Sequence, residues 1–509
     1  MKSTPSTVIL DGESLSFQDI TEIARNHLKA EIAQSALERV SKGRDSIERI
    51  LKSRRTVYGI NTGFGKLAES RVGKKEIDRL QLNLIRSHAV GSGVALEEDE
   101  TRALIVVRLN SLLKGNSGVR DCVVLLLRDF LNNRFLPIIP RHGSLGASGD
   151  LAPSAHLALS LVGEGLAFDK QGAKVRAISR LNELGLRPIR LKAKEGLAII
   201  NGTQVMTGLA CLLTSDSEQA LLNLDIAGAL SLEALGGSLT PFDARVQKLR
   251  PHRGQAQVAT RIQKLVRDSS LIESAGRVQD PYSLRCIPQV HGAFIDAFHY
   301  TKSVVEVEIN SVTDNPIVFP ETDEVLSSGT FHGQPIALAL DFLCFSLAEA
   351  SAYSERRIDK LLSGFNEKLP MFLTKSPGLN SGLMVTQYTA AALVADNKIL
   401  ARPASLENAS VSAGQEDHAS MGLTAALKAR EVLEHTFRVI AIEMLCSAQA
   451  LDLLETKKMG QGTRIAHREI RKISKPLRDD RSMSEEVEKL AIALKEGKIS
   501  RNVGRAIQL

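Results

Sequence analysis

Three small residues, Ala147, Ser148 and Gly149, have the most unusual chemical potential in this sequence, within HGSLGASGDLAPSAH at 142–156. If the backbone is compressed there, the Gly149 nitrogen can attack the Ala147 carbonyl carbon and close a five-membered ring. Only glycine leaves that nitrogen sterically free and tolerates the dihedral angles of the ring. Loss of water, together with dehydration of Ser148, then leaves an exocyclic methylidene, a strong electrophile. The alternative interpretation is a small-residue turn before a helix, with Asp150 as its N-cap.

Motifs for external cofactors and metals are missing from the sequence. The segment YGINTGFGK at 58–66 differs from a phosphate-binding loop, because Ile60 replaces its first glycine and Leu67 its serine or threonine. The glycines around the tripeptide follow GxxGxxG, whereas dinucleotide binding uses GxGxxG. No two histidines lie closer in sequence than His291 and His299, so zinc-ligand spacings are missing as well. We therefore expect no external cofactor and no metal.

Several motifs, taken together with the tripeptide, resemble those of the aromatic amino acid ammonia-lyase family. They follow the family's order along the chain: YGINTGFG (58–65), NGTQ (201–204), QDPYSLR (279–285) and NSVTDNP (310–316). In this family a methylidene-imidazolone prosthetic group forms autocatalytically from Ala-Ser-Gly. The resemblance therefore implies that Ala147, Ser148 and Gly149 supply a covalent, self-derived cofactor. Asp150 resembles the residue that assists ring closure, with N-capping as the alternative.

The resemblance also implies roles for residues around the electrophile. Tyr58 is expected to take the β-proton of the substrate. Its ordinary pKa is about 10, so ionisation at neutral pH costs about 4 kcal/mol unless helix N-termini and cations compensate. Arg285 is expected to bind the substrate carboxylate through paired hydrogen bonds worth about 1.5–3 kcal/mol. The polar shell and the pocket wall are assigned to Asn201, Gln279, Tyr282 and Phe331. The alternatives are a packed loop tyrosine for Tyr58 and a surface salt bridge for Arg285.

Two positions indicate which amino acid is the substrate. Ser87-His88 and the segment QEDH at 415–418 stand where phenylalanine- and tyrosine-specific members have other residues. An imidazole ring offers a donor and an acceptor that a phenyl ring lacks, and His88 and Glu416 can meet these groups. A phenyl substrate would leave both unpaired. We expect elimination of ammonia from L-histidine to trans-urocanate, the first step of histidine degradation. Glu416 could instead transfer protons, or begin a helix.

Other functions remain open. A tyrosine or phenylalanine ammonia-lyase, or an aromatic 2,3-aminomutase that makes a β-amino acid, would use the same electrophile. An inactive helical scaffold is a remote alternative. The sequence departs from the family at Ser154, where leucine is usual, and at Thr330, where asparagine is usual. Thr330 adjoins the expected pocket wall and so bears on substrate fit.

The elements that must position these residues are mainly helical. Ser16–Asp19 has the pattern of a capping box. Helical spacing then predicts helices over 32–53, 76–90, 98–114 and 119–132. Longer segments rich in alanine, leucine and isoleucine cover 203–235, 290–310, 334–362, 383–400 and 420–455. Strand signals are weak and are found near 7–10 and 197–200. Polar loops lie between the helices, where chemistry is expected.

These patterns, with the resemblance, predict a mainly α fold with a long central helical bundle similar to that of fumarase and aspartase, and a smaller mixed N-terminal region. We divide the chain into a catalytic region, 1–200, and a long-helix region, 201–509, that carries oligomerisation surfaces and substrate-binding loops. Long helices that are apolar over much of their circumference belong inside a bundle or an oligomer. The resemblance implies a homotetramer with each active site built from three chains.

Composition is that of an ordinary globular protein. The 509 residues are 43% hydrophobic and 24% charged, with a net charge of +7. The basic segment at 457–478 has no aromatic residue to stack bases, so we expect a solvated helix there and no nucleic-acid partner. We expect no signal peptide at the N-terminus and no apolar stretch as long as a membrane span of about 18 residues. The five cysteines form no CxxC pair. A cytoplasmic protein without a membrane partner is expected.

Overall fold

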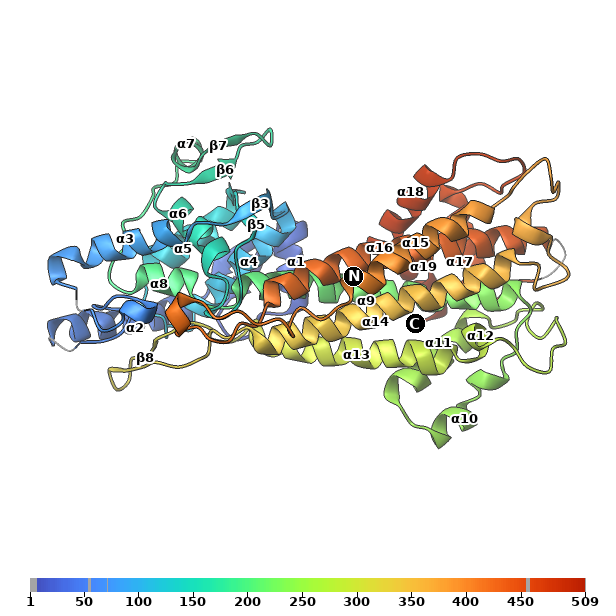
Figure 1. The fold of residues 1–509 in the computed structure, drawn as a ribbon, viewed down its shortest axis with the longest axis horizontal. Helices are drawn as coiled ribbons and strands as arrows, with labels where there is room; N and C mark the ends of the chain where they lie inside the picture. The colour runs from blue at the N-terminus through green and yellow to red at the C-terminus, as the bar shows by residue number, and fades with distance from the viewer. Residues whose placement is uncertain (1–6, 54–55, 71, 455–457, 509) are drawn as a thin grey trace. The chain divides into compact units, whose positions relative to one another are not determined.

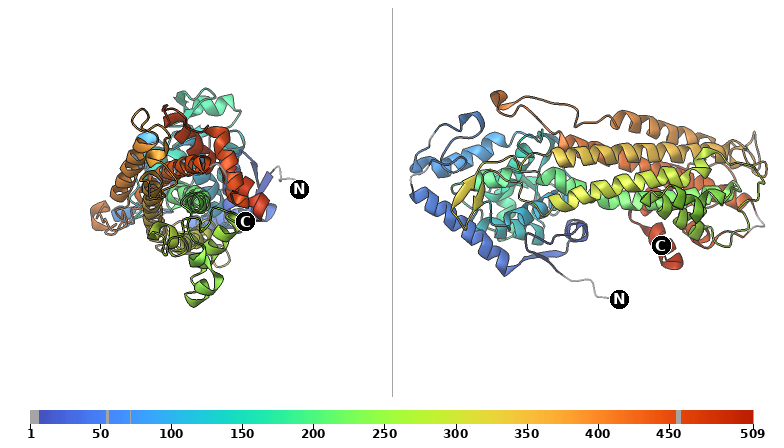
Figure 2. Two further views of the ribbon diagram at one scale, coloured as in Figure 1. Left: turned by 90° about the vertical axis from the view of Figure 1, so that its right-hand side faces the viewer. Right: turned by 90° about the horizontal axis from the view of Figure 1, so that it is seen from below.

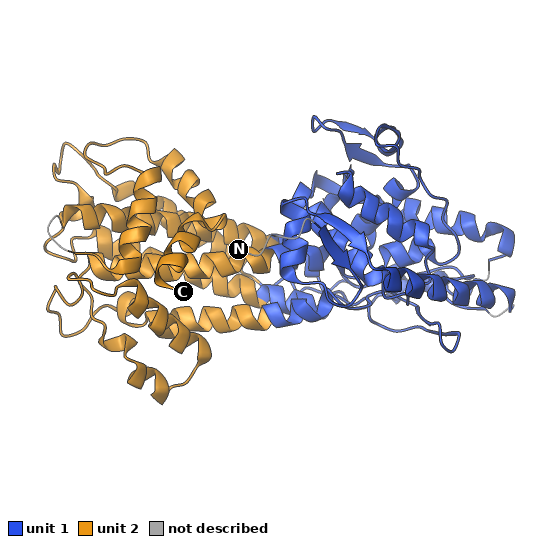
Figure 3. Ribbon diagram, turned by 180° about the vertical axis from the view of Figure 1, so that it is seen from behind, with its two compact units in different colours: residues 1–212, 302–341, 403–427 blue, residues 213–301, 342–402, 428–509 orange. Residues whose placement is uncertain are grey.

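The computed structural model of the chain describes residues 7–53, 56–70, 72–454 and 458–508. Its fold is mainly α-helical, as predicted (Figure 1). The chain forms two compact units, one of residues 1–212, 302–341 and 403–427 and the other of residues 213–301, 342–402 and 428–509 (Figure 3). The segments 302–341 and 403–427 thus join the N-terminal residues in the first unit. The unit boundaries fall within α9 (Gln204–Ala234), α13 (Ile287–Glu308), α14 (Gln334–Leu362) and α16 (Gly422–Leu453), and after Arg402.

The first unit contains short helices and all the strands of the described chain. Its helices are α1 (Phe17–Arg25), α2 (Gln34–Lys52), α3 (Ile77–His88), α4 (Glu98–Leu112), α5 (Asp121–Asn132), α6 (Leu151–Leu161), α7 (Ala177–Glu183) and α8 (Glu195–Ile200), with the 3-10 turns η1 (Gly65–Leu67), η2 (Lys74–Glu76) and η5 (Ser412–Gly414). Helix α4 is buried along nearly its whole length and packs against α1 and α5. It forms the centre of this unit.

The strands make four small sheets in the first unit. Strand β1 (Thr7–Leu10) pairs in parallel with β2 (Lys29–Ile32), and β3 (Ser92–Ala95) pairs antiparallel with β5 (Pro140–His142). Strands β4 (Leu136–Pro137), β6 (Leu166–Phe168) and β7 (Lys174–Arg176) form an antiparallel sheet in that order, and β8 (Ile317–Phe319) forms a hairpin with β9 (Glu324–Leu326). They serve as connections between helices.

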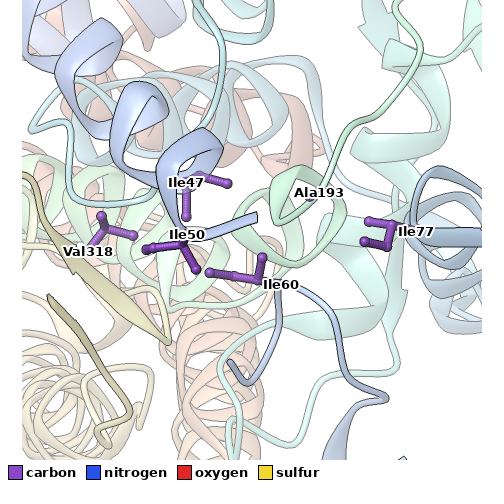
Figure 4. Close-up of a cluster of buried hydrophobic side chains, with 6 residues drawn as sticks. All are labelled: Ile47, Ile50, Ile60, Ile77, Ala193 and Val318. Atoms are coloured by element: carbon purple, nitrogen blue, oxygen red, sulfur yellow. The ribbon is translucent and has the colours of Figure 1, made fainter. Parts of the chain in front are cut away.

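A buried apolar cluster in the first unit joins segments that are distant in sequence. Figure 4 shows Ile47 and Ile50 of α2 facing Ile60, a loop residue, and Val318 of β8. Ala193 and Ile77 complete the cluster. Burial of each isoleucine side chain stabilises the fold by about 1.5–3 kcal/mol. The cluster therefore fixes the loop that contains Ile60.

The second unit is built on long helices that lie side by side (Figures 1 and 2). It contains the C-terminal parts of α9 and α14 and most of α13 and α16, together with α15 (Met384–Leu400). Buried polar contacts link these helices: Arg357 of α14 pairs with Glu443 of α16 at 2.5 Å. Shorter elements complete the unit: η3 (Thr240–Phe242), α10 (Ala244–Leu249), α11 (Arg253–Leu265), α12 (Tyr282–Arg285), η4 (Met371–Leu373), α17 (Gln461–Ile473), α18 (Ser484–Lys495) and α19 (Lys498–Ile507).

Most of the predicted elements are confirmed. The long helices and the four shorter ones form with ends shifted by a few residues, and Ser16 and Asp19 make the reciprocal bonds of a capping box. Glu455, the predicted end of the last long helix, and Lys457, the start of the basic segment, lie outside the described residues. The strand predicted at 197–200 is wrong, because these residues form α8. A short apolar run that is buried on all sides has no period that separates strand from helix.

Helix α14 contradicts the prediction that no apolar stretch is as long as a membrane span. It contains an 18-residue window apolar enough to cross a membrane, and 67% of this window is buried inside the protein. One such helix is weak evidence for a membrane span, since the core helices of large proteins pass the same test.

A buried ion pair links two segments of the first unit that are distant in sequence. Lys194 precedes α8 and Asp314 lies in the segment 310–316; their charged groups are 2.5 Å apart and both side chains are 0% exposed. Removal of one partner from such a pair leaves an uncompensated charge in a medium of low dielectric constant. The pair therefore holds two distant segments together.

Replacement of Lys194 by methionine should destabilise the protein by about 3–5 kcal/mol, because Asp314 would stay buried without its partner. Urea unfolding followed by circular dichroism measures this loss. Arg49→Met, which removes the exposed Arg49–Asp323 pair (2.6 Å), is the matched control and should change the unfolding midpoint little. Equal effects of the two substitutions would contradict a special role for the buried pair.

Candidate active site

A cavity of about 990 Å³ in the first unit gathers side chains from several loops. Its lining includes Tyr58, His88, Ala147, Ser148, Asn201, Phe331 and Glu416. Five polar segments, at 58–66, 142–156, 313–316, 329–335 and 415–421, contribute residues to the lining of this cavity, whereas the polar segment at 279–291 does not. Residues separated by hundreds of positions in sequence thus surround one space beside the Ala-Ser-Gly tripeptide.

The tripeptide is held on both sides by backbone hydrogen bonds. Before it, the Gly146 carbonyl accepts from the Gly333 N–H (3.2 Å) and from the Ser420 hydroxyl (3.1 Å). After it, the Asp150 N–H donates to the Gly202 carbonyl (2.8 Å). Three separate segments of the chain therefore fix the ends of the tripeptide, which is the arrangement that a compressed backbone requires.

Gly149 is in a position that only glycine can occupy. Its φ is +71°, and a Cβ there would lie 2.1 Å from the Gly202 carbonyl oxygen. Ala147 is buried, whereas Ser148 is half-buried and lines the cavity. The surroundings thus fit a methylidene-imidazolone ring: close backbone packing behind Gly149, and access to Ser148 from the cavity.

Asp150 occupies the N-cap position of α6, but its side chain does not cap that helix. Its Oδ2 accepts from the Val205 N–H (3.0 Å) and the Met206 N–H (2.8 Å), and its Oδ1 accepts from the Ser144 hydroxyl (2.7 Å). The N-cap alternative is therefore wrong for α6, because the carboxyl binds the first turn of α9 instead. Burial raises its pKa to about 6, against these hydrogen bonds and the charge of Arg108. Near neutral pH the group can therefore hold or release a proton.

Tyr58 is placed by a loop that the hydrophobic core anchors. Ile60, two residues later, is fully buried in the cluster of Figure 4. Further along the loop, η1 packs against η5, which precedes Glu416. The Gly65 N–H lies 3.4 Å from the Tyr58 phenol oxygen. The same packing therefore brings Tyr58 and the loop of Glu416 to one side of the cavity.

The pKa of Tyr58 is raised and not lowered. Burial is the main cause, and the charges of Glu416 and Asp314 act in the same direction, whereas the Gly65 N–H opposes them. Within the part of the chain that the structure describes, no cation or helix N-terminus is among the causes that act on this pKa. Tyr58 is a neutral phenol at neutral pH in this environment.

His88 is the last residue of α3 and has a defined tautomer. Its Nδ1 lies 2.8 Å from the Leu84 carbonyl oxygen, which can only accept, so Nδ1 carries the hydrogen. The Ser87 hydroxyl also donates to this carbonyl (3.0 Å). Nε2 of His88 is therefore left as a hydrogen-bond acceptor on a residue that lines the cavity.

Glu416 lies in an irregular segment before α16. Its backbone pairs with Val411 around η5, and α16 begins at Gly422, so Glu416 does not start a helix as the alternative interpretation had it. Its half-buried carboxylate has no hydrogen-bond partner in the described residues. An acceptor of this kind is available to a ligand.

Asn201 connects the electrophile to the cavity. Its side chain is 5% exposed, and Nδ2 donates to the Ser148 carbonyl oxygen (3.3 Å). Its Oδ1 is buried without a partner in the described structure. A buried acceptor without a donor costs free energy, so a ligand donor at this point would be favoured.

The two departures from the family motifs have structural explanations. Thr330 is exposed; its hydroxyl donates to the Asp314 carbonyl (2.7 Å) and lies 3.1 Å from the hydroxyl of Ser328, which lines the cavity. Ser154 is fully buried on α6 and accepts from Gln204 Nε2 (2.5 Å). Thr330 thus supports a loop, and Ser154 belongs to a polar network behind the tripeptide.

Three of the residues singled out in sequence lie in the second unit and do not line the cavity: Gln279, Tyr282 and Arg285. Tyr282 is 70% exposed, and the Arg285 guanidinium lies 5.0 Å from the centre of its ring. Arg285 has no carboxylate partner in the described chain, so the surface salt bridge given as its alternative is not found. Both side chains are available to a further ligand or chain.

Charge around the cavity is unbalanced. Its lining contains Glu69, Glu416 and Asp417 but, among the residues that the structure describes, no lysine or arginine. No three histidine, cysteine, aspartate or glutamate side chains of the described residues gather closely enough to hold a metal ion. The cavity by itself therefore favours a cationic group such as an ammonium.

Some residues around the cavity could not be singled out from sequence, because their importance comes from packing. His332 and His418 stack at 5.4 Å between ring centres beside the cavity, and the His332 Nε2 hydrogen is donated to the His418 carbonyl (3.2 Å). Arg108 lies fully buried in α4 behind the tripeptide. The available signal for Arg108 was one charged residue inside the apolar run ALIVVRLNSLL.

Comparisons with known proteins found similar sequences and similar folds over nearly the whole chain. A family model for aromatic amino acid lyases matches residues 15–472. The chain is 45% identical over 504 residues to a histidine ammonia-lyase of Alkaliphilus oremlandii, with 99% of each chain covered. The solved histidine ammonia-lyase of Trypanosoma cruzi has a TM-score of 0.92 at 38% identity, covering 98% of this chain and 95% of that one. A tyrosine aminomutase of Streptomyces globisporus has a TM-score of 0.94 at 36% identity, covering 99% of both.

The raised pKa of Asp150 predicts a dependence of stability on pH. Because the folded value of about 6 exceeds the ordinary 3.8, the native chain binds more protons between these values, and stability falls as pH rises through them. The test uses a Ser148→Ala background, in which the tripeptide stays unmodified. There the free energy of unfolding of the Asp150→Asn variant, minus that of the protein with Asp150, should rise by roughly 2–3 kcal/mol between about pH 4 and pH 7. Urea unfolding at both pH values measures the gain.

Asp243→Asn is the control for this measurement. Arg245 lowers the pKa of Asp243 to about 2, so both its folded and its ordinary value lie below the tested range. Its effect on stability should therefore stay nearly constant. A constant effect of Asp150→Asn as well would show that the Asp150 carboxyl does not titrate there.

Proposed function

The chain belongs to the aromatic amino acid lyase family, and from this membership we propose that it eliminates ammonia from L-histidine to give trans-urocanate, the first step of histidine degradation. It is a carbon–nitrogen lyase. The observation that carries the choice of substrate is the pair of unpartnered acceptors, His88 Nε2 and the Glu416 carboxylate, in the same cavity as Ser148. Hydrocarbon rings offer nothing to such acceptors.

Recognition of the imidazole ring follows from the tautomer of His88. Since Nδ1 donates to Leu84, Nε2 of the neutral ring can only accept, and the Glu416 carboxylate is a second acceptor. An imidazolium has two N–H donors and satisfies both groups. Its positive charge also withdraws electrons from the side chain, which makes the β-hydrogen more acidic. A phenyl ring in the same place leaves two polar groups desolvated without partners.

Conversion of Ala147-Ser148-Gly149 to a methylidene-imidazolone supplies an electrophile that makes the substrate amino group a better leaving group. Asn201 would support this chemistry with both ends of its amide. Nδ2 holds the Ser148 carbonyl at 3.3 Å, and the unpartnered Oδ1 is placed to accept a hydrogen from the substrate amine. Phe331 forms part of the cavity wall and excludes water beside the reacting carbons.

Removal of the β-proton falls to Tyr58 or to Glu416. An ionised tyrosine costs about 4 kcal/mol at neutral pH even at its ordinary pKa, and the raised pKa of Tyr58 increases this cost. Glu416 is a carboxylate in the same cavity, and its charge acts on Tyr58. We propose that Tyr58 takes the β-proton and that Glu416 accepts the phenol proton beforehand or binds the imidazole ring.

The substrate carboxylate needs a cation that the lining of the cavity does not supply. We propose that Arg285 binds it, with Gln279 and Tyr282 beside it, and that these three residues come from another subunit of a homotetramer. Apolar side chains exposed on the long helices of the second unit support such an assembly: Tyr300, Phe342, Phe345, Val385, Tyr388 and Ile399. Exposed apolar surface of this extent is favourable only when another chain covers it.

We propose a cytoplasmic enzyme that has neither nucleic acid nor a membrane as a partner. The five cysteines, all within the described residues, form no disulfide with one another, which is typical of a reducing compartment. An aromatic 2,3-aminomutase remains the second candidate, because a tyrosine aminomutase shares the fold. The two activities differ in product, an unsaturated acid that absorbs ultraviolet light or a β-amino acid.

Incubation with histidine, phenylalanine and tyrosine should give ultraviolet-absorbing product from histidine. Glu416→Ala should lower kcat/KM for histidine about a hundredfold or more. The variant either removes a charged partner of the imidazole ring or removes the group that accepts the phenol proton of Tyr58. Any residual rate on phenylalanine should change much less. Asp417→Ala, which removes the same charge one residue away, is the control. Equal losses on both substrates, or a β-amino acid as the product, would refute the proposed specificity.

Mixing two inactive variants tests whether sites are shared between chains. Ser148→Ala removes the electrophile, and Arg285→Glu opposes the substrate carboxylate, so each alone should lose about a hundredfold or more in activity. Hybrids formed by co-expression contain some sites with an intact Ser148 from one chain and an intact Arg285 from another, and should recover part of the activity. Hybrids as inactive as both parents would contradict sites built from several chains.

A further inference from the structure

Helix α4 (Glu98–Leu112) has two arginines whose side chains are almost completely buried, Arg102 and Arg108. Burial lowers the pKa of each guanidinium to about 10, so both stay cationic at neutral pH. A charge this deep is tolerated only where its N–H groups find acceptors. The acceptors of the two arginines lie in different parts of the first unit.

Arg108 binds the polypeptide between α8 and α9. Its Nη1 donates to the Ala198 carbonyl (3.0 Å), and its Nη2 donates to the Asn201 carbonyl (2.7 Å) and to the Gln204 side-chain oxygen. Carbonyls at a helix C-terminus lack partners within the helix and favour a cation. Arg108 therefore ties the end of α8 to the first residue of α9 and fixes the turn at 201–203.

That turn is the surface against which the tripeptide is held. The Asn201 side chain donates to the Ser148 carbonyl (3.3 Å), and the Gly202 carbonyl accepts from the Asp150 N–H (2.8 Å). A Cβ on Gly202 would lie 2.9 Å from Arg108 Nη2, so the guanidinium lies directly behind the turn. A shift of Arg108 would move hydrogen-bond partners on both sides of Gly149.

We propose that Arg108 is a positioning residue for ring closure of the tripeptide and sets the rate at which the electrophile forms. The inference rests on the proposed function. In this step the Gly149 nitrogen bonds to the Ala147 carbonyl carbon. The carbonyl oxygen leaves as water with the amide hydrogens of Gly149 and Ser148. The Ser148 hydroxyl leaves as a second water with the α-hydrogen of the same residue.

Position controls this reaction because its two reacting atoms belong to neighbouring planar peptides. Well-oriented intramolecular reactions gain several kcal/mol from geometry alone, and small displacements are costly. Each hydrogen bond from a charged donor contributes about 1.5–3 kcal/mol to holding the turn. Arg108 acts on the backbone that presses on Gly149, and its charge also keeps the nearby Asp150 carboxyl more acidic.

Gln204 extends the same support to the helix after the tripeptide. Because arginine only donates, the Gln204 oxygen must face Arg108, and its Nε2 then donates to Ser154 on α6 (2.5 Å). Leucine is usual in the family at position 154, so this last bond is a particular feature of the present chain. The network thus links α4, the turn at 201–203 and α6 around Gly149.

Arg102 provides a matched control on the same helix. It is as deeply buried, and it donates to the carbonyls of Ile23 (2.7 Å) and Leu131 (2.9 Å), which belong to α1 and α5. Its replacement by lysine removes the same forked donor and keeps the charge, but leaves the turn at 201–203 untouched. Differences between Arg108→Lys and Arg102→Lys therefore report on the place of the arginine and not on its burial.

The test is the time course of dehydration of the full chain. Wild type, Arg108→Lys and Arg102→Lys are made by cell-free synthesis, and intact mass spectrometry of the folded fraction follows the loss of two waters. Arg108→Lys should dehydrate about tenfold more slowly than wild type, as expected for the loss of one charged hydrogen bond, and Arg102→Lys at nearly the wild-type rate. Once dehydrated, Arg108→Lys should have a near-normal KM for histidine.

Gln204→Met is the second variant, for the case that Arg108→Lys does not fold. It removes one acceptor of Arg108 and should slow dehydration by a smaller factor. Dehydration of the folded Arg108 variant at the wild-type rate, or equal slowing by Arg102→Lys, would overturn the role of Arg108 and leave the proposed function intact. Wild-type protein that keeps its full translated mass would overturn both.

Discussion

The contact between Gly149 and Gly202 leaves no room for a side chain, and the arrangement of the first unit follows from it. The tripeptide is held there by segments that are distant in sequence: the Gly333 N–H before it and the Gly202 carbonyl after it. The Asp150 side chain accepts two further hydrogen bonds from the start of α9. Ring closure is easier in a restrained backbone than in a flexible one. The conformational entropy needed to bring the two reacting atoms together is lost during folding and not during the reaction.

Charge is arranged differently on the two sides of this contact. Behind it lie buried groups of both signs, Arg108 and Lys194 with Asp150 and Asp314, which compensate one another in a medium of low dielectric constant. In front, the cavity presents carboxylates and hydrogen-bond acceptors. This polarity suits a substrate that brings an ammonium group and an imidazolium ring. It leaves the substrate carboxylate to a cation from outside the described lining, which is why we assign Arg285 to it.

Much of the fold could be predicted from sequence, because long helices have strong and redundant patterns. The segments that form α9, α13, α14, α15 and α16 are apolar over many turns, so errors at single positions do not matter. The strand predicted at 197–200 was wrong because four consecutive apolar residues have no period that distinguishes a strand from a helix. The joining of 302–341 and 403–427 to the N-terminal residues could not be predicted either, since it depends on packing between helices and not on local pattern.

The sequence by itself determined the chemistry on offer, because Ala147-Ser148-Gly149 can close a ring only in that order and with that glycine. It also identified the segments that contain Tyr58, His88 and Glu416. Only the tertiary structure decided what these side chains can do: that burial raises the pKa of Tyr58, that Leu84 fixes the tautomer of His88, and that Asp150 binds α9. Proton affinity and hydrogen bonding depend on neighbours in space and on exclusion of water, and neither is encoded in the spacing of residues along the chain.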